Sequence, residues 1–300
     1  MMAAQQHTAW AGELLENEPM SRHTTWRVGG PARRYYRPLS IDDLAIFLQS
    51  LPEQEPIVWI GLGSNLLVRD GGIAATVIAT SGALDCVRIL SGQRIYVESG
   101  SSCAKVARYA ARHGLAGAEF LSGIPGTMGG ALAMNAGCFG GETWQRVSRV
   151  QTLDRHGVLR WREPSDYEVA YRHVRGPKDE WFVAAELQLE QGDAQALQQA
   201  NRALLDKRGA AQPTRWPSAG SVFRNPEGDY AARLIDSAGL KGLRLGGALV
   251  SEQHANFIVN AGEASAADIE ALIHKVQDEV ERVHGLRLQT EVCVIGEEAP

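Results

Sequence analysis

The 300-residue chain has few cysteines, and they are widely spaced. Cys86, Cys103, Cys138 and Cys293 form no CxxC pair, which argues against both a zinc site and a disulfide framework. We therefore expect no metal site. Four free thiols suit a reducing compartment such as the cytoplasm.

The chain also lacks long apolar runs and a strong charge of either sign. Its first twenty residues carry Glu13, Glu16 and Glu18 and have no basic start followed by an apolar core, so we expect neither export nor membrane insertion. A net charge of −5 offers no general attraction to nucleic acid or to anionic membranes. The expected partners are small molecules, and we expect a cytoplasmic monomer.

Two common nucleotide-binding signatures are absent. The element GLGSNLLVRDGG at 61–72 follows an apolar run, 57–60, which predicts a buried strand that ends in a tight turn. Leu66 stands where a dinucleotide fingerprint needs its third glycine. No Gly-Lys followed by Ser or Thr provides a triphosphate loop. What remains is an anion-binding nest of backbone N–H groups around Ser64 and Asn65.

A second glycine element, GIPGTMGGALAMNAG at 123–137, is apolar, which is unusual for a surface loop. Such small residues leave the backbone exposed to a ligand, and Asn135 adds an amide that binds a carbonyl or a ring nitrogen. Two such elements predict one elongated ligand that carries phosphates. We expect positive φ or close ligand approach at Gly123, Gly126, Gly129 and Gly130.

Strand and helix patterns alternate irregularly, without the regular rhythm of a parallel sheet, so the sequence predicts an α+β fold. Ser40 with Asp43 begins a helix that reaches about residue 51, and residues 103–113 read as a helix that Gly114 ends. Strands are expected near 76–80 and 94–99, and a hairpin is expected to turn at 156–157. An Ala- and Gln-rich helical stretch follows 192–193, where we place the main domain boundary.

The end of the chain has two clear patterns. Ser265 and Asp268 cap a helix that Gly285 ends, with a predicted core face formed by Ile269, Leu272, Ile273, Val276, Val280 and Val283. The sequence then alternates as a strand, with Leu286, Leu288, Val292 and Val294 on one side. From this alternation alone, we expect the Glu291 carboxylate to lie on the solvent-facing side of the strand.

Several motifs together resemble the UDP-N-acetylenolpyruvoylglucosamine reductase family. They are GLGSNLLV at 61–68, GIPGTMGGALAMNAGCFGG at 123–141, YR at 171–172, PSAGSVFRNP at 217–226, HANF at 254–257 and a terminal strand containing Glu291. The resemblance runs in order over nearly the whole chain. It implies a peptidoglycan-precursor enzyme with noncovalent FAD and with NADPH as co-substrate, which reduces UDP-N-acetylenolpyruvoylglucosamine to UDP-N-acetylmuramate.

The resemblance also implies a domain order. After an N-terminal segment, 1–20, we expect an FAD-binding domain of the PCMH or vanillyl-alcohol-oxidase type at 21–192, built from two α+β subdomains. A smaller α+β substrate-binding domain would occupy 193–300. The residues that the resemblance assigns to FAD are Gly61, Gly63, Ser64, Asn65, Leu66, Gly123, Ile124, Pro125, Gly126, Thr127, Gly129, Gly130, Asn135, Ala136 and Gly137.

Three residues match the catalytic positions of the family. Ser221 would donate a proton to the substrate carbon, and Arg172 and Glu291 would be its charged neighbours. Nothing near Ser221 resembles a His/Asp pair or a GxSxG elbow, so nucleophilic catalysis is disfavoured. From local sequence alone, Arg172 reads as a surface arginine. The resemblance outweighs that interpretation.

Substrate contacts are likewise implied by the resemblance, at Tyr171, Arg224, Asn225, His254 and Asn256. Arg224 replaces the family's lysine, which keeps the charge and changes its geometry. Residues 173–175 depart from the family's pattern, so no contacts are assigned to His173, Val174 or Arg175. The short interval from 172 to 221 resembles the form of the family without a Tyr-bearing loop.

Two other classes stay open. A flavin-linked oxidase of the same general fold often tethers its cofactor through His or Cys, and Cys138 and His113 are the candidates near the glycine elements. A nucleotide-sugar binder without activity is the second alternative, which the presence of Ser221, Arg172 and Glu291 together disfavours.

Overall fold

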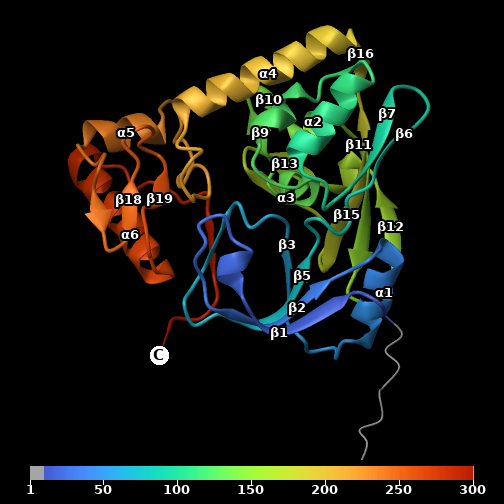
Figure 1. Cartoon of the computed structure of the whole chain (residues 1–300), viewed down its shortest axis with the longest axis horizontal. Helices are drawn as coiled ribbons and strands as arrows, with labels where there is room; N and C mark the ends of the chain where they lie inside the picture. Colours follow the sequence, from blue (N-terminus) through green and yellow to red (C-terminus); the bar gives the residue numbers. More distant parts are fainter. Residues whose placement is uncertain (1–9, 300) are drawn as a thin grey trace, which may run out of the picture.

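The computed structural model describes residues 10–299, which form a mixed α/β molecule (Figure 1). By packing, it has an N-terminal unit, residues 10–211, and a C-terminal unit, residues 212–299. Of the predicted N-terminal segment, residues 1–9 lie outside the described residues. Most of the rest forms a strand of the first sheet. Within residues 10–299, no helix combines the length and apolarity needed to cross a membrane.

The first sheet has the strand order β1-β2-β5-β3. Both neighbours of β5 run parallel to it, whereas β1 is antiparallel to β2. The four strands are β1 (Glu13–Pro19), β2 (Pro31–Arg37), β3 (Ile57–Ile60) and β5 (Ile73–Ala79). Helix α1 (Ile41–Ser50) follows β2, and Ser40 Oγ accepts a hydrogen bond from the Asp43 N–H, as the capping pattern predicts.

The second sheet is antiparallel throughout, with the order β12-β11-β15-β7-β6. Its strands are β6 (Val87–Ile89), β7 (Arg94–Glu98), β11 (Val147–Asp154), β12 (Leu159–Arg162) and β15 (Glu180–Gln188). The predicted hairpin joins β11 to β12 and turns at Gly157, whose φ is 75°. Helices α2 (Cys103–Arg112) and α3 (Met128–Ala133) share a core with the sheet.

Short paired strands connect these parts. They are β4 (Leu66–Val68) with β20 (Cys293–Ile295), β8 (Leu115–Ala116) with β16 (Glu190–Gln191), β9 (Gly137–Cys138) with β10 (Gly141–Glu142), and β13 (Glu168–Ala170) with β14 (His173–Arg175). Four 3-10 turns complete the N-terminal unit: η1 (Met20–Arg22), η2 (Glu119–Gly123), η3 (Thr143–Gln145) and η4 (Pro164–Asp166).

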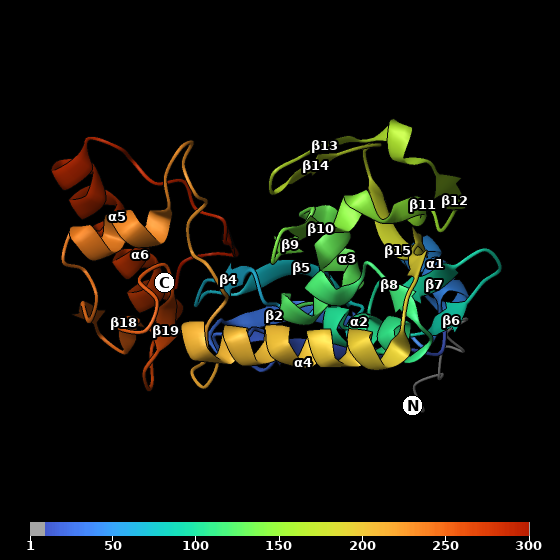
Figure 2. The ribbon, with the colours of Figure 1, turned by 90° about the horizontal axis from the view of Figure 1, so that it is seen from above.

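Helix α4 (Ala194–Ala211) begins just after the predicted boundary at 192–193. It packs on α2 and η2, and Asn201 Nδ2 donates to the Ala107 carbonyl at 3.2 Å. From there α4 extends toward the C-terminal unit (Figures 1 and 2). The exact domain boundary stays a prediction. The packing assigns this helix to the N-terminal unit.

The C-terminal unit packs a small antiparallel sheet against α6. Its elements are α5 (Ala231–Ser237), β17 (Arg244–Leu245), β18 (Ala248–Val250), β19 (Ile258–Asn260) and α6 (Ala266–His284). The Ser265–Asp268 capping box is formed, and Gly285 ends α6 in the left-handed region. Val283 was predicted to lie in the core and is instead 44% exposed, because the last turn of α6 extends past the sheet.

The predicted terminal strand is much shorter than its alternating pattern. Only Cys293–Ile295 forms a strand, and Leu286 is 39% exposed. The segment before it bends, with an isolated bridge between Phe223 and Thr290. The bend turns Glu291 inward: its side chain is 16% exposed, so the solvent-facing orientation given by periodicity alone is wrong.

The two units share a core. Trp26, Val28 and Leu67 from the N-terminal unit lie in the same apolar cluster as α5 and α6. Trp26 is fully buried, and its Nε1–H donates to the Ile258 carbonyl at 2.8 Å. Asn260 Nδ2 donates in turn to the Trp26 carbonyl at 3.0 Å. These contacts fix the position of the C-terminal unit on the first sheet.

We expect Trp26→Phe to lower the free energy of unfolding by about 1–3 kcal/mol, because the buried Ile258 carbonyl loses its donor. Urea denaturation followed by circular dichroism measures this change. The matched control, Trp216→Phe, alters an indole that is 51% exposed and should stay within about 0.5 kcal/mol of the wild type. Equal losses in both variants would contradict a special role for Trp26.

Candidate active site

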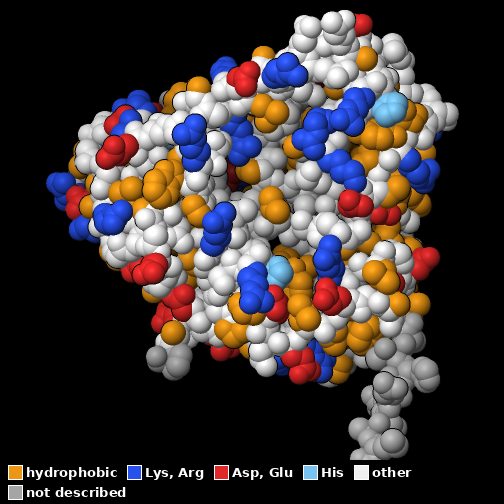
Figure 3. Space-filling view, viewed as in Figure 1, with side chains coloured by type: hydrophobic (Ala, Val, Ile, Leu, Met, Phe, Trp, Pro, Cys, Tyr) orange, Lys and Arg blue, Asp and Glu red, His pale blue; other side chains and the backbone are white. Residues whose placement is uncertain are grey.

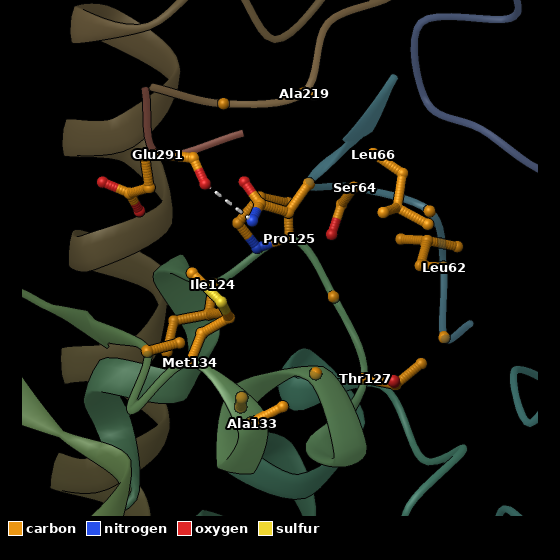
Figure 4. Close-up of a pocket in the computed structure, with 18 of the residues that line it drawn as sticks. Leu62, Ser64, Leu66, Ile124, Pro125, Thr127, Ala133, Met134, Ala219 and Glu291 are labelled. Atoms are coloured by element: carbon orange, nitrogen blue, oxygen red, sulfur yellow. Dashed lines mark hydrogen bonds between the residues drawn. The ribbon is translucent and has the colours of Figure 1, made fainter. Parts of the chain in front are cut away.

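A cavity of about 380 Å³ lies where the two units meet. The surface is hollowed between the units, with Lys and Arg side chains beside the hollow (Figure 3). In Figure 4, Glu291 and Ala219 border one side of the cavity and Leu62, Ser64 and Leu66 another, while Ile124, Ala133 and Met134 lie across from them. Both predicted glycine elements therefore border the same space.

The three predicted catalytic residues all line this cavity. Arg172 Nε donates to Glu291 Oε1 at 2.7 Å, and a terminal nitrogen of Arg172 donates to the Gly137 carbonyl at 3.1 Å. Arg172 sits at the tip of the β13–β14 hairpin with φ 54°, an unusual conformation for a residue with a side chain. Ser221 reaches the cavity from the segment after α4. Residues far apart in sequence thus form one cluster.

Burial and nearby positive charges have opposite effects on the pKa of Glu291. Burial raises its pKa above the ordinary value, and the positive charges of Arg172 and Arg224 offset this rise only in part. A carboxyl group with a raised pKa at a cavity wall can hold and release a proton closer to neutral pH. Its backbone is also fixed, because Asn65 Nδ2 donates to the Glu291 carbonyl at 3.1 Å.

The first half of the first glycine element lines the cavity, and this includes the predicted residues Gly61, Gly63, Ser64, Asn65 and Leu66. Gly63 has φ 69°, and a side chain there would collide with the His23 carbonyl. A side chain at Gly61 would collide with Thr127 Oγ1. The glycines are therefore needed where this element packs on its neighbours.

The second element lines the cavity through Gly123, Ile124, Pro125, Gly126, Thr127, Gly130, Ala136 and Gly137. The expectation of positive φ was wrong, because none of its glycines adopts it. Close packing explains two of them instead. A Cβ at Gly123 would lie 2.5 Å from the Phe139 ring, and one at Gly129 would lie 3.0 Å from Ser99 Cβ.

Gly129 and Asn135 were predicted to bind the cofactor and are not among the cavity-lining residues. The Gly129 N–H donates to the Ser99 carbonyl at 2.8 Å. Asn135 is 2% exposed, donates to Glu142 and to the Ala170 carbonyl, and accepts from the Trp144 N–H. The Asn135 amide therefore supports the wall and the β13–β14 hairpin next to its turn.

Asn256 likewise holds structure in place. It is buried, and its side chain exchanges two hydrogen bonds with the Phe223 backbone, at 2.8 and 2.9 Å. Its carbonyl accepts from the Val222 N–H at 2.9 Å. The Asn256 side chain therefore fixes the segment that follows Ser221, and its contact with the substrate stays a prediction.

The other four predicted substrate residues lie outside the cavity lining. Tyr171 is 47% exposed beside Arg172, and the Asn225 side chain accepts from the Ala231 N–H at the start of α5. Arg224 is close enough to Glu291 and Cys293 for its charge to lower their pKa values. His254 packs edge-on against Phe257, which lines the cavity, and burial lowers the pKa of its imidazole.

Sequence reasoning missed several lining residues, among them Trp59, Gln212, Phe257 and Cys293. They come from separate elements, and none belongs to a glycine motif. Among residues 10–299, Trp59 Nε1 and Thr127 Oγ1 are fully buried without a hydrogen-bond partner. Of the two suggested tether residues, Cys138 lines the cavity and His113 does not.

The search of residues 10–299 for metal ligands finds no cluster of three His, Cys, Asp or Glu side chains. All four cysteines are free thiols.

Thiol labelling can report whether the cavity is filled. Alkylation needs the thiolate, and burial raises the pKa of the Cys138 and Cys293 thiols. Labelling at both should therefore keep rising with pH beyond about 8.5, the ordinary thiol value. A ligand that fills the cavity should protect these two and leave the exposed Cys86 reactive, as measured by mass spectrometry after iodoacetamide. Equal protection of all three would contradict a local effect.

Two family models match separate parts of the chain. Residues 32–161 match the FAD binding domain, and residues 212–295 match the UDP-N-acetylenolpyruvoylglucosamine reductase C-terminal domain. The predicted fold class, an FAD-binding domain of the PCMH type followed by a smaller α+β domain, is confirmed.

Curated relatives cover nearly the whole chain. A UDP-N-acetylenolpyruvoylglucosamine reductase of Alkalilimnicola ehrlichii is 62% identical over 297 residues, covering 99% of each chain. One from Legionella pneumophila (strain Corby) is 58% identical over 95% of this chain and 93% of its own. The crystal structure of the Thermus caldophilus reductase has a TM-score of 0.81 at 34% identity, covering 95% of this chain and 98% of that one. The chain belongs to the UDP-N-acetylenolpyruvoylglucosamine reductase family.

Proposed function

We propose that the protein is an FAD-dependent reductase that uses NADPH to convert UDP-N-acetylenolpyruvoylglucosamine to UDP-N-acetylmuramate in peptidoglycan precursor synthesis. The observation that carries the proposal is the meeting of Ser221, Arg172 and Glu291 in one cavity bordered by both glycine elements. The names of the relatives and of the matched C-terminal domain support it. Four free thiols suit the cytoplasm, where we place the enzyme.

The cavity wall suits FAD. A Cβ at Gly130 would meet only Thr127 Oγ1, at 4.0 Å, so the backbone there faces open space. Thr127 and Trp59 also line the cavity. The elements Gly61–Leu66 and Gly123–Gly137 would hold the cofactor. When bound, the flavin supplies two-electron chemistry between NADPH and the enolpyruvyl double bond.

Arg172 would bind the enolpyruvyl carboxylate. Its Nε is bonded to Glu291, while its terminal nitrogens keep donors for a second carboxylate. Negative charge on that carboxylate grows as the double bond is reduced, and a preplaced guanidinium stabilises such charge most where water is excluded. The hairpin that carries Arg172 is fixed next to its turn by the hydrogen bond from Asn135 to the Ala170 carbonyl, so the cation needs little reorganisation.

Ser221 would donate the proton that the substrate carbon needs. A hydroxyl is a weak acid in water, so its donor role depends on neighbouring groups that stabilise the alkoxide and return the proton. Glu291 is suited to that return because burial raises its pKa. Asn256 holds the backbone next to Ser221 and would keep the hydroxyl directed into the cavity.

The proposed UDP contacts are Arg224 and Asn225 for the diphosphate, with Tyr171 and His254 at the margin. Arg224 Nε is buried without a hydrogen bond among residues 10–299, so it retains a donor for a phosphate oxygen. Asn256 acts behind this region, through the backbone.

The first test concerns the cofactor. The protein should purify yellow with one FAD per chain, and acid precipitation should release the flavin, whereas a tether at Cys138 would keep it in the pellet. Gly130→Val should weaken flavin retention at least tenfold, because the side chain would enter open cavity space. Gly209→Ala, at an exposed site on α4, is the control. A colourless protein that ignores added FAD would refute the proposal.

The second test separates the half-reactions by stopped-flow absorbance. In Ser221→Ala, NADPH should still bleach the flavin at nearly the normal rate, because no substrate carbon is protonated in that step. Reoxidation by the UDP-sugar should slow by about 10²–10⁴, the range for a lost general acid. Glu291→Gln should slow the same step. Equal slowing of both half-reactions in Ser221→Ala would make Ser221 a binding or structural residue instead.

A further inference from the structure

Arg208 is a partly buried cation without an acidic partner in the described chain. Several partly buried arginines of this chain pair with carboxylates, as Arg69 does with Glu270 and Arg162 with Glu180. Among residues 10–299, the hydrogen bond found for the Arg208 side chain runs from Nε to Gln212 Oε1, at 3.0 Å. A neutral amide does not compensate the charge, and placing an unpaired charge away from water is costly.

The position of Arg208 relates that charge to the cavity. Arg208 lies in the last turn of α4, where this helix reaches the C-terminal unit (Figure 2). Its hydrogen-bond partner Gln212 lines the cavity, and so does Cys138, whose sulfur lies within range of the guanidinium charge. Lys207 lies over the Phe139 ring, 6.0 Å from its centroid, so the same turn covers the loop at 138–139.

The charge balance on this wall is uneven. Arg172 also approaches Cys138, and its charge is opposed by Glu291 at 2.7 Å. Arg208 adds a second positive charge beside the same thiol. A cation in the last turn does stabilise the carbonyl end of a helix, but a fully exposed side chain would serve that purpose without the cost of burial.

We propose that Arg208 is a substrate-binding residue whose guanidinium, oriented by Gln212, receives an anionic oxygen group of the UDP-sugar. The proposal rests on the proposed function for the identity of the substrate. The two terminal nitrogens remain available and suit either a carboxylate or a phosphate as a planar fork. Two groups on the substrate have this chemistry, the enolpyruvyl carboxylate and the diphosphate.

The test compares Arg208→Met with Arg202→Met, an exposed arginine on the same helix. Calorimetric titration with the UDP-sugar in the absence of NADPH gives Kd, and steady-state rates give KM. Arg208→Met should raise both about 10-fold to 100-fold, the loss expected for a charged hydrogen bond, with normal FAD content and an unchanged KM for NADPH. Arg202→Met should stay within twofold of the wild type.

Titration with UDP-N-acetylglucosamine, which has the diphosphate and lacks the enolpyruvyl carboxylate, identifies the contacted group. Weaker binding of this probe to Arg208→Met assigns Arg208 to the diphosphate. Unchanged binding of the probe, with weaker binding of the full substrate, assigns it to the carboxylate.

A second variant tests the same charge without removing the arginine. Gln212→Glu places a carboxylate at the position that Arg208 Nε now contacts, and should weaken substrate binding at least tenfold because its negative charge offsets the guanidinium and repels the anionic substrate. Normal substrate binding in Arg208→Met or in Gln212→Glu would overturn the proposal. A variant that loses FAD or affinity for NADPH, and still binds the UDP-sugar normally, would also overturn it. A wild type that binds the UDP-sugar and does not reduce it would refute the proposed function alone, and the binding comparison would still decide the role of Arg208.

Discussion

The ion pair between Arg172 and Glu291 is the constraint on which the site depends. It joins the tip of a hairpin in the N-terminal unit to the segment just before the last strand of the chain. Each partner has a further anchor: Arg172 on the Gly137 carbonyl, and the Glu291 backbone on Asn65. The Arg172 guanidinium thus ties the second glycine element to the C-terminal unit, and the Asn65 amide ties the first. The Arg172 side chain is 17% exposed, so the ion pair keeps much of the electrostatic attraction that solvent would screen in a surface pair.

Much of the fold could be predicted because its signals are local. The caps at Ser40 and Ser265 act on N–H groups three residues away, and Gly285 supplies the left-handed residue at the end of α6. The alternating pattern after Gly285 gave the wrong orientation for Glu291. A period of two assigns side chains to the two faces of a strand only where the backbone stays extended. Long-range contacts with Phe223 and Asn65 bend this segment and decide where Glu291 points, and no local pattern encodes them.

The motifs that form the site could be predicted from the sequence, whereas the roles of individual motif residues were harder to predict. Ser221, Arg172 and both glycine elements meet as expected, whereas Asn135 and Asn256 turn their amides inward to hold backbone. A motif residue that contacts a ligand and one that supports the contact look alike in sequence. Burial separates them, because a side chain whose polar atoms are all paired inside the protein has none left for a ligand. Gln212 shows the converse, since it belongs to no glycine motif, lines the cavity and accepts a hydrogen bond from Arg208.

The parallel pairing of β20 with β4 gives the protein a particular order of assembly. The Cys293 N–H bonds to the Asn65 carbonyl, and β20 lies beside a strand formed more than two hundred residues earlier. During synthesis from the N-terminus, the glycine elements emerge well before the strand that completes their cavity. The first domain can therefore collapse and protect its own core while the catalytic chamber is still missing a wall. The chamber forms only once Glu291 and β20 have been synthesised, because Glu291 and Cys293 supply part of its wall.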